Sequence, residues 1–296
     1  MKKNKIGLII IIIFLFTLTF YLSYNLELND LNKNILNILT KDFNNNKEVY
    51  RIDFMNMYIN SLKNNNHFII NNKEEITLEV DKVAYNTTEP VIYIYSTHSN
   101  EEYSYLKNNV YNIVPNVKTA SYILESELEK LGINSIVEEE NTIDLLNSKK
   151  LPYSDSYKIS RTLLENKKKE YPSLIYFIDL HRDSVGRNAT TVSINGVSYA
   201  RTMFVLGLEN ENYLENKKVI TEINDYLDKN YKGLSRGIYE KQGSGVNGVY
   251  NQDFNINTML IEVGGVDNTI DEVSNSIKII ANSLYNYINN HKTTKK

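Results

Sequence analysis

The pattern of hydrophobic and polar positions divides the chain into three parts. Residues 6–26 are almost all apolar and carry no charge, residues 27–85 are rich in Asn, Lys, Asp and Glu, and beyond them short apolar runs alternate with amphipathic segments. The 21 uncharged residues would span about 30 Å as a helix, which is the thickness of a bilayer's hydrocarbon core. Lysines precede this run and acidic residues follow it, so the positive-inside rule places the N-terminus in the cytoplasm.

A cleaved signal peptide usually has a shorter apolar region and a cleavage site of the Ala-x-Ala type, and the sequence shows no such site. We therefore predict an uncleaved anchor, with the rest of the chain outside the cytoplasm. The predicted organisation is a cytoplasmic tip and transmembrane anchor (1–26), a polar, partly helical stalk (27–85), a folded domain (86–290) and a short tail (291–296).

The folded part has the pattern of an α/β domain. Strands are predicted at 90–96, 133–139, 173–180 and 258–265, and helices at 116–132, 154–171, 215–231 and 268–288. Asn195-Gly196 lies between two alternating runs and predicts a hairpin turn. Strands that alternate with helices indicate a mixed, mostly parallel sheet flanked by helices.

Composition limits the chemistry. The formal net charge of -3 offers no electrostatic basis for binding nucleic acid. Cysteine is absent, so a metal ion would have to be held by His, Asp or Glu side chains.

Three predicted strands end in reactive side chains. The strand at 90–96 is followed by His98 and Glu101, the strand at 173–180 by His181, and the last strand contains Glu262. Because the carboxyl ends of parallel strands meet at one edge of a sheet, we expect these four side chains to converge there.

Such a set suits a catalytic zinc ion, which takes three protein ligands and leaves one position for water. His98, Glu101 and His181 are the candidate ligands, and Glu262 is the candidate general base. Spacing alone does not separate Glu101 from its neighbour Glu102.

The histidines and Glu101 also have structural interpretations. His98 would then cap the segment after it, and Glu101 would be a solvated loop acid. The "DLHRDS" block around His181 would be an ion-pair cluster, in which Arg182 pairs with Asp179 or Asp183. Glu262 is harder to explain in this way, because a buried carboxylate is costly unless it is paired or bound to a metal.

Four blocks in the same order carry a family resemblance, which covers residues 89–288. They are "YSTHSNEEY" (95–103), "DLHRDS" (179–184), "YNQDF" (250–254) and "LIEVGGVDNTIDEV" (260–273). Together they resemble the stage II sporulation protein P family of endospore-forming bacteria. The first block departs from the family's His-Thr-His pattern, because Ser96 stands at the first histidine and only the second, His98, is present.

This resemblance implies a phosphorylase/hydrolase-like fold and a zinc-dependent N-acetylmuramoyl-L-alanine amidase. Such enzymes cut the stem peptide from the glycan of peptidoglycan, and some also cleave peptide cross-links. It further implies a role in engulfment, on the mother-cell membrane, together with stage II sporulation proteins D and M.

Substrate-binding residues are expected near the second histidine and in the "NQD" segment. Arg182 follows His181 directly, and amide side chains suit peptide and sugar groups, so we expect Arg182, Asn251, Gln252 and Asp253 to line the substrate groove.

Two alternatives stay open from the sequence. A zinc carboxypeptidase would use the same four residues, with Arg182 binding the terminal carboxylate. A non-catalytic scaffold that binds the cell wall would carry a degenerate site.

Overall fold

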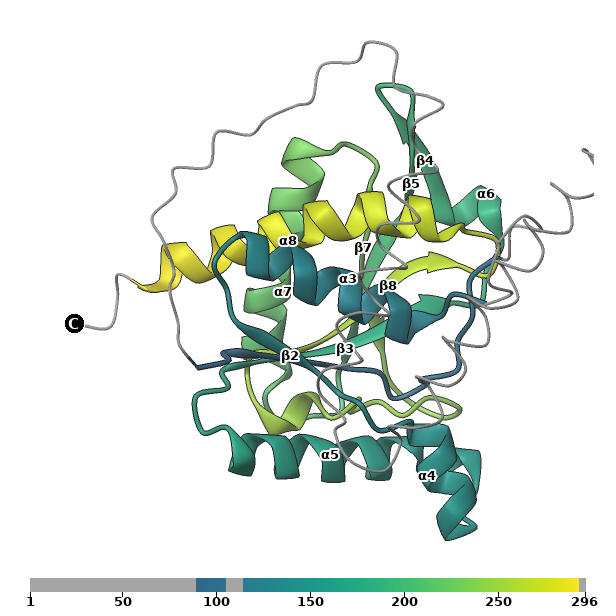
Figure 1. The fold of residues 1–296 in the computed structure, drawn as a ribbon, viewed down its shortest axis with the longest axis vertical. Coiled ribbons are helices and arrows are strands. Elements are labelled where there is room, and N and C mark those ends of the chain that lie inside the picture. Colours follow the sequence, from purple (N-terminus) through teal and green to yellow (C-terminus); the bar gives the residue numbers. More distant parts are fainter. Residues whose placement is uncertain (1–88, 105–113, 293–296) are drawn as a thin grey trace, which may run out of the picture. The chain divides into compact units, whose positions relative to one another are not determined.

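The structure is a computed structural model that describes residues 89–104 and 114–292 (Figure 1). These residues belong to one compact unit of the chain, Glu79–Lys296. The predicted anchor and stalk lie outside the described residues, so both stay predictions. Within the described ranges, none of the helices is long and apolar enough to cross a membrane.

Six strands form one mixed sheet in the order β2-β1-β3-β8-β6-β7. Neighbouring strands β2, β1, β3 and β8 are parallel, whereas β6 runs antiparallel to β8 and parallel to β7. The strands are β1 (Ile92–Tyr95), β2 (Ser135–Val137), β3 (Tyr176–Asp183), β6 (Thr202–Gly207), β7 (Ser235–Lys241) and β8 (Thr258–Gly265). The predicted α/β fold with a mostly parallel sheet is confirmed.

A separate two-stranded ribbon is made by β4 (Thr191–Ile194) and β5 (Val197–Ala200). Its turn is the predicted Asn195-Gly196 pair, and both residues have positive φ angles of 51° and 76°. Two successive positive φ values are what the tight turn of a hairpin requires, and Asn and Gly tolerate them best.

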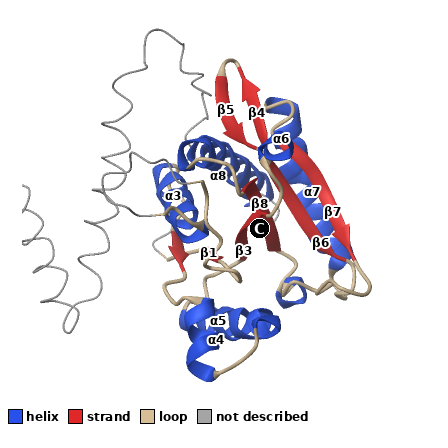
Figure 2. Ribbon diagram, turned by 90° about the vertical axis from the view of Figure 1, so that its right-hand side faces the viewer, coloured by secondary structure: helices blue, strands red, loops and turns tan. Residues whose placement is uncertain are grey.

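Helices cover both faces of the sheet. They are α3 (Val117–Lys130), α4 (Thr142–Lys149), α5 (Ser156–Glu170), α6 (Arg187–Thr190), α7 (Tyr213–Asn230) and α8 (Ile270–Lys292). Helices α4 and α5 lie on one side of β1 and β3, and α3 and α8 lie on the other (Figures 1 and 2). Helix α7 packs against β6, β7 and α8.

The ends of α3 follow local sequence signals. The side chain of Asn116 accepts a hydrogen bond from the backbone N–H of Thr119, and the Thr119 hydroxyl accepts one from the backbone of Asn116. This reciprocal pair satisfies two backbone donors that a helix start leaves unpaired. At the other end Gly132, with a φ of 77°, turns the chain toward β2.

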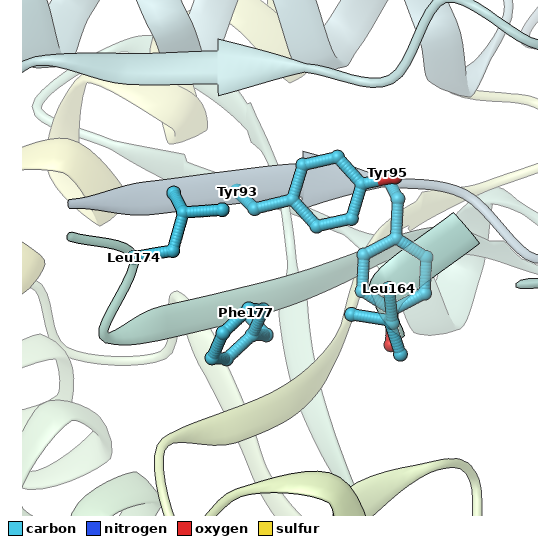
Figure 3. Close-up of a cluster of buried hydrophobic side chains, with 5 residues drawn as sticks. All are labelled: Tyr93, Tyr95, Leu164, Leu174 and Phe177. Atoms are coloured by element: carbon cyan, nitrogen blue, oxygen red, sulfur yellow. The ribbon is translucent and has the colours of Figure 1, made fainter. Parts of the chain in front are cut away.

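One face of the sheet carries both an aromatic core and the polar groups of interest. Tyr93, Tyr95 and Phe177 pack with Leu164 of α5 and Leu174 in one buried cluster (Figure 3). Side chains alternate between the two faces along a strand, so every second residue after Tyr95 or Phe177 in the same strand shares this face.

The pairing of the strands shows which side chains share this face near the carboxyl ends of β1, β3 and β8. Tyr95 is paired with Asp179, and His181 is paired with Glu262. Asp179, His181 and Glu262 therefore lie on the face that α5 covers, at the end where β1, β3 and β8 stop.

Candidate active site

The loop after β1 is fixed to β3 by a buried carboxylate. Asp179 is fully buried and accepts hydrogen bonds from the backbone N–H of Thr97 at 2.8 Å and from the Thr97 hydroxyl at 2.6 Å. The following turn is closed by a hydrogen bond of 3.0 Å from the Glu101 N–H to the His98 carbonyl. His98 and Glu101 thus lie at the two ends of a single turn, which follows the carboxyl end of β1.

The three predicted metal ligands meet at this turn. Nδ1 of His181 lies 3.5 Å from Oε2 of Glu101, and the rings of His98 and His181 are 5.2 Å apart at 86°. Glu101 Oε2 also accepts a hydrogen bond of 2.9 Å from the backbone N–H of Arg182. Glu102 is exposed and its backbone bridges to Asn116, so the structure places Glu101 rather than Glu102 beside the histidines.

His181 lies between two carboxylates. Its side chain is almost fully buried, and Nε2 is 2.9 Å from Oδ1 of Asp179 on the side away from Glu101. That oxygen is within hydrogen-bonding distance but out of line with the ring N–H, so the attraction is chiefly electrostatic. A buried site with two carboxylates on one imidazole requires a positive charge.

The pKa values reflect this requirement. Burial alone would lower the pKa of His181, but Asp179 and then Glu101 outweigh it and raise that pKa well above its ordinary value. Burial would raise the pKa of Glu101, but contact with His181 and with the Arg182 N–H lowers it. For His98, burial and the neighbouring His181 lower the pKa, so this ring is neutral at neutral pH.

In the described ranges, no three His, Asp or Glu side chains are already arranged around a common metal position. One separation nevertheless fits zinc. Zinc binds nitrogen and oxygen at about 2.0–2.2 Å, so two of its tetrahedral ligand atoms lie about 3.3–3.5 Å apart. The 3.5 Å between His181 Nδ1 and Glu101 Oε2 matches that spacing and exceeds an ordinary hydrogen bond.

Two further observations agree with a metal position here. Nδ1 of His98 is buried and has no hydrogen-bond partner. Asp179 lies on the second nitrogen of His181, as carboxylates commonly do beside a metal-binding histidine. Sequence analysis had not given Asp179 this role, since only the register of β3 against the loop after β1 places it there.

Glu262 is a half-buried residue in the last strand of the site. Its Oε2 atom is buried and has no hydrogen-bond partner. Burial is the main cause that raises the pKa of Glu262 to about 7. The charges of Glu101 and Asp183 raise this pKa further, whereas His181 and Lys241 lower it. A carboxylate that titrates near neutral pH is suited to accept and return a proton.

Arg182 does not form the carboxylate pairs that the structural interpretation expected. Its Nη1 donates to the backbone carbonyl of Asp183 at 3.1 Å, whereas the Asp183 carboxylate pairs with Arg236 at 2.6 Å. Asp179 is engaged by Thr97 and His181 instead. Nε of Arg182 is buried and has no acceptor.

The "NQD" segment is used mainly for internal contacts. Gln252 is 1% exposed, and its side chain bonds to the backbone N–H of Gly207 at 2.9 Å and the carbonyl of Val205 at 2.7 Å. Asp253 forms a two-pronged ion pair with Arg161 of α5, at 2.8 and 2.9 Å. These contacts hold α5 and β6 in place, and direct contact of this segment with substrate stays a prediction.

Two tyrosines that sequence analysis did not assign flank His98. The ring of Tyr153, which is 60% exposed, stacks on His98 at 4.8 Å and 14°, and Tyr157 meets the same ring edge-on at 5.7 Å. Tyr250 in turn meets Tyr157 edge-on at 5.5 Å. The rest of α5 separates residues 153–157 from β3 in the sequence, so their approach to His98 depends on tertiary packing.

Comparison with known proteins places the chain in a family. Residues 23–285 match the family model of stage II sporulation protein P. The stage II sporulation protein P of Bacillus subtilis (strain 168) is 36% identical over 197 residues, which cover 64% of this chain and 49% of that protein. The chain thus spans about half the length of this curated relative.

Solved structures show weaker likeness. The CwlD amidase from Clostridioides difficile, solved in complex with the GerS lipoprotein, is 14% identical with a TM-score of 0.42, over 69% of this chain and 100% of that chain. The N-acetylmuramoyl-L-alanine amidase AmiC2 of Nostoc punctiforme is 10% identical with a TM-score of 0.37, over 68% and 97%. The family match covers most of the chain, and the chain belongs to the stage II sporulation protein P family.

Proposed function

We propose that this protein is a membrane-anchored, zinc-dependent peptidoglycan hydrolase that acts in sporulation. The reaction is that of an N-acetylmuramoyl-L-alanine amidase, and cleavage of peptide cross-links is a second activity to test. Membership of the stage II sporulation protein P family supports the biological setting.

One observation carries the chemistry. Glu262 pairs with His181 in the sheet, and one oxygen of its carboxylate is buried without a hydrogen-bond partner. A protein keeps such an oxygen at a cost, because burying a polar atom without a partner is unfavourable. A proton-transfer role explains why it is there.

The residues divide into two roles. His98, Glu101 and His181 would hold zinc, and Asp179 would fix the orientation of His181. Zinc, when bound, polarises an amide carbonyl and makes water a stronger nucleophile. Glu262 accepts a proton from the attacking water and returns it to the nitrogen of the cleaved amide, so that the leaving group departs as a neutral amine.

The setting outside the cytoplasm rests on the predicted anchor. Its position would hold the catalytic domain against the cell wall, with the substrate outside the mother-cell membrane during engulfment. Stage II sporulation proteins D and M are the partners that we propose on the strength of the family.

The proposed function is tested with Glu262→Gln in purified full-length protein in detergent. Gln is nearly isosteric and the proposed zinc ligands lie elsewhere, so zinc content and melting temperature should equal those of wild type. Release of free stem peptide from muropeptides should fall by about 100-fold or more, because general acid–base catalysis is lost. Glu211→Gln, which makes the same change at an exposed residue, is the matched control. Undiminished cleavage by Glu262→Gln would refute the general-base role.

A zinc carboxypeptidase is the second candidate, and one observation favours it. The unpaired Nε of Arg182 would bind the terminal carboxylate of a peptide. The products separate the two reactions, since an amidase frees the whole stem peptide from muramic acid and a carboxypeptidase removes only its last residue. A scaffold without catalysis would release neither product.

A further inference from the structure

Tyr157 reaches the candidate site from the first turn of α5. Its ring lies between two other aromatic rings, edge-on to His98 at 5.7 Å and 81° and edge-on to Tyr250 at 5.5 Å and 77°. These two contacts fix the plane of the phenol. The residue is half-buried.

The backbone of Tyr157 is held from a distant part of the chain. Nδ2 of Asn251 donates to the Tyr157 carbonyl at 3.1 Å and to the Ser160 hydroxyl at 2.9 Å. Asn251 has a φ of 56°, a left-handed conformation that Asn tolerates better than most residues. One turn further along α5, the ion pair between Arg161 and Asp253 joins the same two segments.

This arrangement gives the "NQD" segment a physical purpose. Two hydrogen bonds and one two-pronged ion pair set the position of the first turns of α5 relative to the sheet. The turn that they fix is the one that carries Tyr157.

A neutral phenol can donate a hydrogen bond through its O–H. Tyr157 therefore brings a donor to the part of the site that contains His98.

We propose that Tyr157 is a catalytic residue whose hydroxyl donates a hydrogen bond to the carbonyl oxygen of the amide that is cleaved. This inference rests on the proposed function. As water attacks, that oxygen gains negative charge, so a donor held in place beside it stabilises the transition state more than the bound substrate. Asn251 is a positioning residue in this proposal, because its side chain donates to the backbone of Tyr157.

Tyr226 provides a contrast. It is half-buried like Tyr157, but it belongs to α7, which packs against β6, β7 and α8. Removing its hydroxyl should change little, which makes it a matched control.

The test compares Tyr157→Phe with Tyr226→Phe in the full-length protein in detergent, with muropeptide as substrate. Tyr157→Phe keeps the ring contacts and loses only the donor, so kcat should fall by about 10- to 100-fold while KM stays within about twofold. Zinc content and melting temperature should match wild type. Tyr226→Phe should keep kcat within about twofold of wild type.

A double substitution tests the positioning role. Asn251→Ala should lower kcat, and adding it to Tyr157→Phe should lower kcat little further, because both changes remove the same contact. Independent, multiplying effects would overturn the positioning role.

Three results would overturn the catalytic role. They are an unchanged kcat in Tyr157→Phe, a loss of zinc or of melting temperature in that variant, and an equal loss of kcat in Tyr226→Phe. Failure of the wild-type protein to release stem peptide would instead reject the proposed function, and this inference with it.

Discussion

Replacing Asp179 with Asn tests how the site is assembled. The carboxylate accepts two hydrogen bonds from Thr97 and lies 2.9 Å from Nε2 of His181. A hydrogen bond to a charged group contributes about 1.5–3 kcal/mol and one to a neutral group about 0.5–1.5 kcal/mol, so neutralising both bonds should cost about 2–3 kcal/mol. In a domain of this size that loss lowers the melting temperature by about 4–12 °C.

The same change should weaken zinc binding. Loss of the carboxylate behind a metal-binding histidine typically lowers metal affinity by about 10- to 100-fold. Both effects are measurable on one preparation, by thermal unfolding of the zinc-free protein and by competition of the zinc-loaded protein with a chelator. Asp225→Asn, the same substitution at an exposed position of α7, controls for the change of net charge.

The melting temperature and the zinc affinity of Asp179→Asn together distinguish two roles for Asp179, in fastening the loop and in supporting the metal site. Lower stability with unchanged zinc affinity would show that Asp179 only fastens the loop after β1. If Asp179→Asn keeps both the wild-type melting temperature and the wild-type zinc affinity, the reasoning about this carboxylate is wrong.

Two other predictions concern stability and location. Glu272 accepts hydrogen bonds from Arg187, Ser198 and Asn268. Burial alone would raise the pKa of Glu272, but these donors outweigh burial and lower that pKa to about 2. The stabilising effect of the carboxylate is therefore present above its ordinary pKa of 4.5 and is lost as the pH falls toward 2. Glu272→Gln should therefore lower the melting temperature at neutral pH, with a difference from wild type that shrinks in acid; a constant difference would contradict this assignment. The full-length protein should also sediment with membranes and keep its original N-terminus, and recovery of a soluble form that begins near residue 25 would refute the predicted anchor.

The convergence of His98, Glu101, His181 and Glu262 could be predicted from the sequence. Each residue follows or ends a short apolar run, and the topology of parallel strands brings such ends together whatever the details of packing. The structure shows the same convergence, with His181 and Glu262 as direct partners in the sheet.

The supporting contacts could not be predicted in the same way. The role of Asp179 depends on the pairing of Tyr95 with Asp179, and a shift of one residue would turn its side chain to the other face. Asn251 itself has a left-handed backbone conformation, which redirects the chain just before Gln252. From this position its side chain reaches the Tyr157 carbonyl. Helix α4 and strand β7 were also missed, since neither Thr142–Lys149 nor Ser235–Lys241 has a long apolar run.

The order of the strands has a consequence for how the protein matures. The proposed ligand His98 directly follows β1, whereas Glu262 lies in β8, and more than half of the chain separates them in sequence. Contacts between such distant segments form late in folding. Under the proposed function and the predicted anchor, a chain still crossing the membrane would hold His98 outside while Glu262 had yet to emerge, and it could not yet cut the wall. Cleavage would then begin only when the last strand had joined the sheet.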